Sequence, residues 1–509
     1  SLVKDLGGMD FKTFDGYFLQ EAVYLRDVAL WARGDVLDDL SRAKNLFNWT
    51  IRNIQLEEDA QDRIPLFPWE TLLFGRGTPA ERSWLFILLA RQEGLDAVLL
   101  ALADPAENTP IARGIRPLQP WCVGVLIDKN VYLFDPILGM PIPAKNGIQH
   151  DAQGRLDIQP ATLAEVIADE SLLRRLDLDS SNAYPFKSED LQNVVVLVEA
   201  SPSSLSYRME LTQSRLAGKQ KMVLTTSAAG QAERWKSLPH ISRAQLWLTP
   251  YKTLERREHL TPDEICGILA EFLRFYALPD APLSQGRLLH LKGQLAGQQG
   301  ATGFYQASRP ADQELQFLAS LPSSQELDRL RQNLTKIKTD LAKAGNDPSA
   351  QPSPLIQQKK QEMDERLENL ALAKMVKKLE EEYSEVVMKT LQFNSEEEKK
   401  LTRERLNQEA LRLMLVYILL GKQDATYWLG LIAYERGNYN SATDYLLKRT
   451  LEKSAEGGPW SHGARYNLAR TVEAAGETQR AAMMYQADPD APDLLGRLLR
   501  ARWLQEKNE

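Results

Sequence analysis

Two segments near the C-terminal end repeat each other, and this repeat constrains the fold of its region more than any other feature of the chain. Residues 427–445 align with residues 466–484 at an offset of 39 residues. Like residues coincide at three positions, which pair Leu429 with Leu468, Gly437 with Gly476 and Ala442 with Ala481. Small residues at such positions let two helices cross closely, and a glycine permits the turn between them. The spacing predicts two successive helical hairpins, followed by an amphipathic capping helix over 493–505.

The repeat resembles the tetratricopeptide repeat, in which each unit is a helical hairpin of about 34 residues. The longer offset here fits the insertion Glu456-Gly-Gly-Pro-Trp460. In that family the first helix of each hairpin lines a concave face that binds extended or helical peptides. The resemblance therefore implies a partner-binding face, formed by Tyr427, Leu431, Tyr434, Tyr466, Asn467, Arg470 and Glu473. The alternative is that Tyr427 and Tyr434 pack against the neighbouring domain.

Three blocks of the N-terminal region form a second pattern. Residues 42–54 carry mostly apolar positions at helical spacing, namely Ala43, Leu46, Phe47, Thr50 and Ile54. Residues 75–97 predict a buried helix that ends in the turn Gly94-Leu95-Asp96-Ala97. Residues 121–136 predict a hairpin around Asp128-Lys129-Asn130 that ends in Asp135-Pro136. Together the three blocks resemble a transglutaminase-like (papain-type) domain.

That family uses a Cys nucleophile at a helix N-terminus, a His beside it, and an Asp or Asn that orients the His. Here the Cys position falls on Pro79 and the His position on Pro120 or Trp121, while Asp135 keeps the third position. Pro79 suits the first turn of a helix, where the missing N–H costs little. The resemblance therefore implies a degenerate, non-catalytic domain. The alternative is a thiol enzyme, a transamidase or cysteine protease, with an unorthodox site around Cys122 and Asp135.

Between the two resemblances the pattern is first mixed and then helical. Residues 193–200 predict a buried strand, 203–216 a helix and 220–226 a second strand, without a glycine-rich phosphate loop. A heptad of apolar residues follows, formed by Leu327, Leu330, Leu334, Ile337 and Leu341. With a second amphipathic stretch it predicts a coiled-coil hairpin over about 323–392, and self-association through 327–341 and 356–391. The alternative is that both helices pack on the body of the protein.

Composition excludes several function classes. The 509 residues carry a net charge of −7, and no basic stripe stands out, so nucleic acid is not an expected partner. Two cysteines and five scattered histidines form no ligand cluster, so neither a metal nor a cofactor is expected. The sequence contains no run of about 18 apolar residues, so no membrane span is expected. The first residue is Ser1, so the compartment stays open: the cell envelope or periplasm if an upstream signal or anchor was removed, otherwise the cytoplasm.

These observations predict a multidomain α+β protein that continues as all-α. The expected domains are a degenerate transglutaminase-like domain over 1–185, a small α/β unit over 186–275, a helical region over 276–420 and repeats with a capping helix over 421–509. The expected function is a non-catalytic interaction or scaffold protein that binds other proteins or peptides through the repeat groove and the degenerate cleft. A structural component of a large assembly, joined through the helical hairpin, is the further alternative.

Overall fold

A computed structural model of the chain describes residues 6–60, 62–103, 118–278, 280–312, 395–453 and 455–506, with the single positions 315, 332, 335 and 336. The chain forms two compact units. Unit 1 comprises Ser1–Ile265, Arg287–Leu295 and Tyr427–Glu509, and unit 2 comprises Cys266–Gly286 and Ala296–Thr426. The predicted hairpin over 323–392, with its heptad, lies outside the described residues apart from the single positions 332, 335 and 336.

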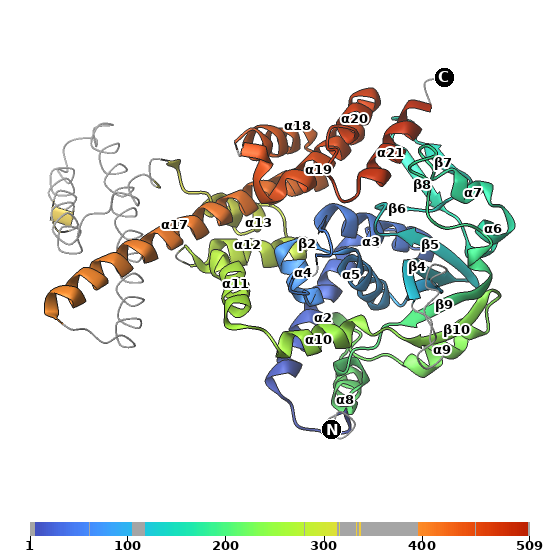
Figure 1. Cartoon of the computed structure of the whole chain (residues 1–509), viewed down its shortest axis with the longest axis horizontal. Helices are drawn as coiled ribbons and strands as arrows, with labels where there is room; N and C mark the ends of the chain where they lie inside the picture. The colour runs from blue at the N-terminus through green and yellow to red at the C-terminus, as the bar shows by residue number, and fades with distance from the viewer. Residues whose placement is uncertain are drawn as a thin grey trace, which may run out of the picture. The chain divides into compact units, whose positions relative to one another are not determined.

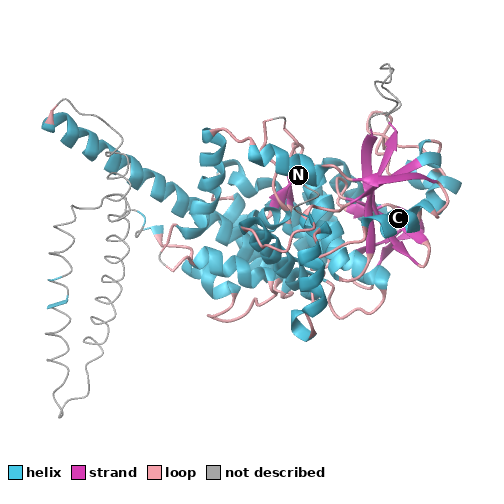
Figure 2. Cartoon of the chain, turned by 90° about the horizontal axis from the view of Figure 1, so that it is seen from below, coloured by secondary structure: helices cyan, strands magenta, loops and turns pink. Residues whose placement is uncertain are grey.

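Unit 1 is built around a mixed six-stranded sheet in the order β10-β9-β3-β4-β5-β6 (Figure 2). Its strands are β3 (Asp96–Ala103), β4 (Leu118–Ile127), β5 (Asn130–Asp135), β6 (Met140–Pro141), β9 (Val194–Val198) and β10 (Ile241–Leu246). Two small pairs accompany it, β1 (Gln55–Leu56) with β2 (Arg76–Gly77) and β7 (Pro143–His150) with β8 (Leu156–Pro160). Neighbours in the main sheet are antiparallel except for β9 and β10, which run parallel.

Several helices of unit 1 pack against the sheet (Figure 1). In chain order they are α2 (Thr13–Ala32), α3 (Asp39–Asn53), α4 (Pro68–Phe74), α5 (Pro79–Gln92), α6 (Leu163–Ala168), α7 (Ser171–Arg174), α8 (Tyr207–Arg215), α9 (Ala228–Lys236), α10 (Thr249–Glu258), α18 (Tyr439–Thr443), α19 (Ser461–Ala474), α20 (Thr478–Tyr485) and α21 (Leu494–Glu506). A π-helical stretch, Asp444–Leu451, extends α18. Helices α11 (Pro262–Leu273), α12 (Pro282–Leu291) and α17 (Glu396–Glu435) contain the points where the chain passes between units.

The three N-terminal blocks fold as their patterns predict. The apolar positions of 42–54 are buried in α3. The turn after α5 contains Gly94 at φ +75° and leads into β3. The hairpin of β4 and β5 turns through Asp128 and Lys129, both at positive φ, which is the geometry of a two-residue hairpin loop. These helical and strand predictions are confirmed.

The domain boundaries differ from the predicted ones. Strand β9 pairs with β3 through Leu99↔Leu197, so residues 186–246 continue the N-terminal sheet and form no separate α/β unit. The predicted strand over 220–226 is wrong: those residues form a 3-10 turn and an irregular stretch, and β10 is the parallel partner of β9. The C-terminal hairpins share one hydrophobic core with the sheet, in which Tyr466, Leu499 and Trp503 pack with strand residues. They therefore belong to unit 1.

Unit 2 is helical. It contains α13 (Ala301–Ala307) and parts of α11, α12 and α17. Ile418 of α17 is buried, and Asp424 pairs with Arg274 at 3.0 Å. Pro310 accepts a hydrogen bond from the Lys422 ammonium group at 2.7 Å, which ties α17 to the chain after α13. Among the described residues of both units, no helix is long and apolar enough to cross a membrane.

Candidate functional sites

The position expected for a nucleophile begins helix α5. Pro79 is the first helical residue, as predicted, and Thr78 is the N-cap. The Thr78 hydroxyl accepts from the Glu81 N–H at 3.3 Å, and the Glu81 carboxylate accepts from the Thr78 N–H at 2.9 Å. This capping box satisfies the free N–H groups of the first turn. Pro79 has no thiol, and the Glu81 carboxylate occupies the N-terminal end of the helix.

Arg82, one turn into α5, joins the parts of the cleft. Its guanidinium is buried and donates to the carbonyl oxygens of Ile54 (2.9 Å), Pro136 (3.2 Å) and Ile51 (3.4 Å). Burial lowers the pKa of Arg82 to about 10, so it remains a cation at neutral pH. The side chain closes the carbonyl end of α3 and holds the turn after β5. Sequence reasoning missed it, although an arginine among the apolar residues of α5 is the signal for such a role.

Asp135 ends a buried hydrogen-bonded chain where a catalytic His would act. The Tyr184 hydroxyl donates to Asp135 Oδ2 at 2.8 Å, and the Trp121 indole N–H donates to the Tyr184 oxygen at 2.8 Å. Asp135 Oδ1 accepts from two backbone N–H groups of the following turn. Burial raises the pKa of Asp135, against the effect of these hydrogen bonds. Pro120 is exposed on β4, so Trp121 occupies the inward position expected for the His.

Cys122, the alternative nucleophile, is fully buried in β4. Burial, and next the charge of Asp135, raise the pKa of its thiol well above the ordinary value. A thiol with a raised pKa is a poor nucleophile at neutral pH. The ionisable groups that act on Cys122 are Asp135 and Tyr184, and neither supplies the imidazole that a papain-type site uses as its proton acceptor.

The predicted concave face of the repeats is turned inward. Tyr427, Leu431, Tyr466, Asn467 and Glu473 are buried, and Tyr434 and Arg470 are half-buried. The Asn467 amide donates to the Arg52 carbonyl oxygen and to the Tyr427 hydroxyl, each at 3.0 Å. The Arg52 guanidinium lies 4.6 Å over the Tyr434 ring. Asn467 and Tyr434 therefore contact α3 of the same chain, as the packing alternative predicts for Tyr434. Tyr427 is buried against Trp460 and Asn467, so these residues do not line an open groove.

The remaining predicted residues form a charged core of the repeats. Glu473 binds the Arg500 guanidinium through both oxygens, at 2.7 and 2.8 Å, and accepts from the Leu156 N–H at 3.1 Å. Burial raises the pKa of Glu473, but Arg500 and Arg470 outweigh burial and lower it to about 2. Arg470 donates to the Tyr466 hydroxyl at 3.2 Å. This cluster fixes α21 and β8 against α19.

The residues predicted to form the cleft and those predicted to form the repeat face thus cover each other. Gln55, directly after α3, donates to the Pro459 carbonyl at 2.9 Å and accepts from the Gly463 N–H at 2.7 Å. A Cβ on Gly496 of α21 would lie 1.8 Å from the Leu138 carbonyl oxygen after β5. A small space remains between them, lined among others by Arg82, Tyr427 and Asn467. The sequence predicted two separate binding surfaces, and the fold brings them together.

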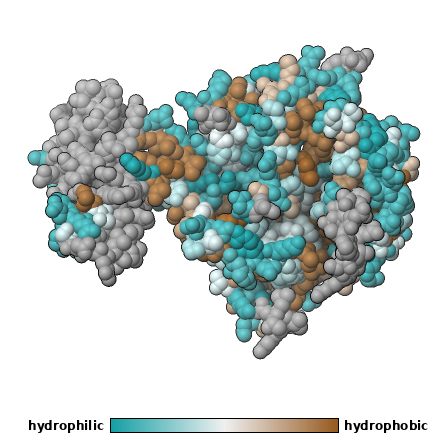
Figure 3. Space-filling model, in the orientation of Figure 1, coloured by the Kyte–Doolittle hydropathy of each residue, from teal (hydrophilic) through white to brown (hydrophobic). Residues whose placement is uncertain are grey.

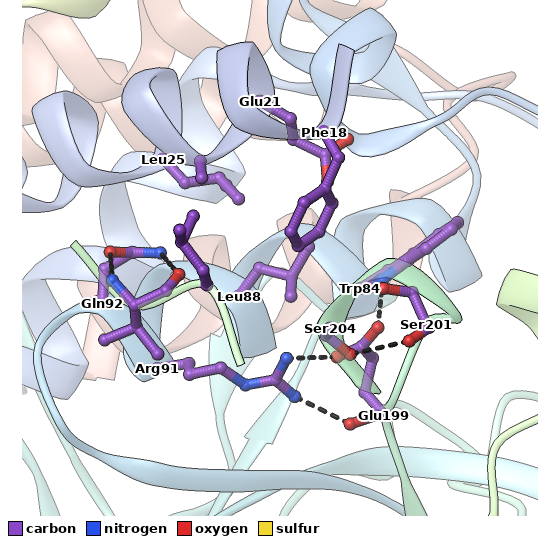
Figure 4. Close-up of a pocket in the computed structure, with 13 residues that line it drawn as sticks. Phe18, Glu21, Leu25, Trp84, Leu88, Arg91, Gln92, Glu199, Ser201 and Ser204 are labelled. Atoms are coloured by element: carbon purple, nitrogen blue, oxygen red, sulfur yellow. Dashed lines mark hydrogen bonds and ion pairs between the residues drawn. The ribbon is translucent and has the colours of Figure 1, made fainter. Parts of the chain in front are cut away.

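A further pocket lies on another side of unit 1, and sequence reasoning missed it (Figure 4). Its volume is about 380 Å³, counted with the solvent space at its mouth. Helix α2, helix α5 and the chain after β9 supply its walls. Glu199 pairs with Arg91 at 2.5 Å and accepts from the Trp84 indole at 3.2 Å. Glu21 reaches the pocket from α2 and accepts one hydrogen bond, from the Trp69 N–H at 3.2 Å.

Burial dominates the chemistry of Glu21. It raises the pKa to about 8, the Trp69 N–H opposes it, and the carboxylates of Glu199 and Glu70 raise it further. Perturbed carboxyl groups in pockets mark candidate functional sites, although structural networks also produce them. Comparison with known proteins adds no further guide to these sites: no family model, no curated protein and no solved structure matches the chain.

Proposed function

We propose that the chain is a non-catalytic interaction or scaffold protein. The observation that carries the proposal is the closed state of the degenerate cleft. Pro79 stands at the nucleophile position, and the Trp121–Tyr184–Asp135 chain fills the place of the His. The C-terminal hairpins cover what would be the mouth of the cleft. A substrate would have to displace part of the protein's own core to reach it.

The partner surface of such a protein lies elsewhere, because the concave face of the repeats is used internally. Helix α11 and the turn after it expose an apolar stripe at helical spacing, formed by Ile265, Leu269, Leu273 and Tyr276, each between 46% and 59% exposed. A Cβ at Gly267 of the same helix would meet nothing within 4 Å. Helix α17 exposes a second stripe, Leu413, Val416 and Leu419 (Figure 3). Exposed apolar stripes of this kind favour docking of another protein.

The two cysteines allow a direct test against the thiol-enzyme alternative. Cys266 is exposed and Cys122 is buried, so Cys266 is an internal positive control. With a thiol reagent at pH 7.5, the folded chain should react rapidly at Cys266 alone, and Cys122 should react only after denaturation. The Cys266→Ser variant should then show no rapid reaction. Fast, saturable labelling of Cys122 in that folded variant would argue for thiol chemistry and against the proposal.

The partner surface is tested with point variants of the intact chain. Leu269→Glu places a charge in the α11 stripe, whereas Asp263→Asn changes an exposed polar position of the same helix. A defined protein that the wild type and Asp263→Asn retain, but Leu269→Glu loses, would support α11 as the partner surface. Equal retention by all three, with unchanged thermal unfolding, would exclude α11 from that role.

A further inference from the structure

The pocket between α2 and α5 contains one carboxyl group more than it has basic partners. Glu199 pairs with Arg91 at 2.5 Å, and Glu70 pairs with Arg257 at 2.6 Å. Glu21 lies close enough to both acids for their charges to act on it, but it makes no ion pair itself. It is 8% exposed, and its Oε1 has no hydrogen-bond partner among the described residues. Ionised Glu21 would leave one uncompensated negative charge in the pocket.

The rest of the pocket is shaped for a small ligand with an apolar part. Its apolar walls are formed by Phe18, Ala22, Leu25, Leu88, Val223 and Leu224. Ser201 and Ser204 add oxygen atoms at one side, where the Ser204 hydroxyl donates to the Ser201 carbonyl at 2.8 Å. Figure 4 shows Glu21 and Phe18 on α2, across the pocket from Glu199 and the two serines. The oxygen atoms and the one unpaired carboxyl group can accept hydrogen bonds beside a mostly apolar wall. Such a site suits a ligand with a single positive charge and several N–H donors.

We propose that this pocket binds the ammonium group of a primary amine, with Glu21 as its counter-ion. One positive charge balances the site, because the other two acids are already paired. An anion is a poorer fit, because the nearby guanidinium groups of Arg91 and Arg257 are already paired with Glu199 and Glu70. A divalent metal ion is a poorer fit, since no group of three or more metal-ligating side chains is found in the described part of the chain. The apolar walls accept the alkyl chain that carries the ammonium group.

The proposal has a characteristic pH dependence. Burial raises the pKa of Glu21 to about 8, so the free site is mostly protonated at neutral pH. A primary amine has a pKa near that of lysine, about 10.4, and stays charged up to pH 9. Binding must therefore release the Glu21 proton below pH 8. The association constant should rise about tenfold per pH unit from pH 6 to pH 7 and become constant above about pH 8.

The source of the ammonium group is distinguished by two probes. Titration calorimetry with n-butylammonium chloride tests a free amine, and N-acetyl-lysine methylamide tests a lysine side chain. Each is measured at pH 6, 7, 8 and 9 with the full chain. Saturable binding of either probe with the stated pH dependence supports the proposal. Tighter binding of the first assigns the site to small amines, and tighter binding of the second assigns it to a lysine of a partner.

The matched variants are Glu21→Gln and Asp35→Asn. Glu21→Gln keeps the shape of the side chain and should lose at least about tenfold in affinity at pH 9, whereas exposed Asp35→Asn should bind as the wild type does. Thermal unfolding of each variant verifies that it is folded. Absence of binding by both probes at pH 9 would overturn the proposal. So would undiminished binding by folded Glu21→Gln, or a pH dependence of binding that this variant retains.

Discussion

Glu473 shows how a single buried residue can hold the C-terminal helices to the β7–β8 pair. Its pKa lies at about 2, below the ordinary 4.5, because the charges of Arg500 and Arg470 outweigh its burial. A lowered pKa means that the folded state favours the ionised form. The stability that Glu473 contributes is therefore fully present above about pH 4.5 and is lost as the pH falls towards 2.

Glu473→Gln should lower the free energy of unfolding by about 3–5 kcal/mol at pH 7, because Arg500 stays buried without its carboxylate. The difference from the wild type should shrink as the pH falls below 4.5. Urea denaturation across pH 3–7 measures both effects. Glu477→Gln, which alters an exposed ion pair one turn away, should change stability by less than about 1 kcal/mol. An equal loss at all pH values would contradict the assignment.

Glu21 predicts the opposite pH dependence. Its pKa is raised from 4.5 to about 8, so the folded state binds the proton more tightly than the unfolded state. Its contribution to stability is fully present below pH 4.5 and is lost as the pH rises to about 8. Glu21→Gln should therefore raise the free energy of unfolding, relative to the wild type, by on the order of a few kcal/mol at pH 8–9 and by little at pH 4.5. A gain that does not vary with pH would contradict this.

Two glycines of helices provide a test at the level of elements. A Cβ at Gly496 in α21 would lie 1.8 Å from the backbone oxygen of Leu138, whereas one at Gly267 in α11 would meet nothing within 4 Å. Gly496→Ala should lower the free energy of unfolding by about 3 kcal/mol or more, since a backbone atom cannot move aside as a flexible side chain can. Gly267→Ala should leave stability unchanged or raise it by up to about 1 kcal/mol. Chemical denaturation compares the two variants, and equal effects would refute the close contact of α21.

The wrong strand prediction has a physical cause. Residues 222–224 form a short apolar run typical of a strand, but two glutamine side chains bind their backbone. Gln92 accepts from the Val223 N–H at 2.9 Å, and Gln213 accepts from the Leu224 N–H at 2.5 Å. Leu224 then packs on Ala22 of α2. The true partner strand, β10, lies at the sheet edge and contains Ser242 and Arg243, so its sequence has little apolar alternation. The pattern of apolar residues does not reveal that side chains will take the hydrogen bonds of a backbone stretch, so it cannot distinguish such a stretch from a strand.

At the scale of the whole molecule, the helices and hairpins of both resemblances were predictable, but their contact was not. Local patterns fix α3, α5, the β4–β5 hairpin and the turns at Gly437 and Gly476, both at positive φ. The bonds that decide the site join Gln55 to Gly463, which are 408 residues apart. No motif encodes such a pairing: nothing in the sequence singles out Gln55, and the pattern predicts Asn467 to face a partner. The predicted binding face therefore emerged as an internal one.

This shared core predicts the behaviour of a truncated chain. Removal of residues 421–509 takes Tyr466, Leu499 and Trp503 out of the core that contains the sheet. The remaining 1–420 should lose its cooperative thermal transition and aggregate, because the apolar surface of the sheet becomes exposed. Co-expression of 421–509 as a separate chain is the control, and should restore soluble material. A truncated chain that unfolds like the intact one would show that the N-terminal part folds alone.

The contact between Gln55 and Gly463 also bears on how the protein is made. A ribosome adds about 5–20 residues per second, so the 408 residues between them take roughly 20–80 s to synthesise. The last strand of the sheet, β10, is complete at Leu246, so during the later part of that time the nascent sheet exists without the helices that complete its core. A cell producing this protein must therefore shield a half-finished domain from the completion of β10 until the C-terminal helices are made, and a chaperone acting on the growing chain is the natural agent.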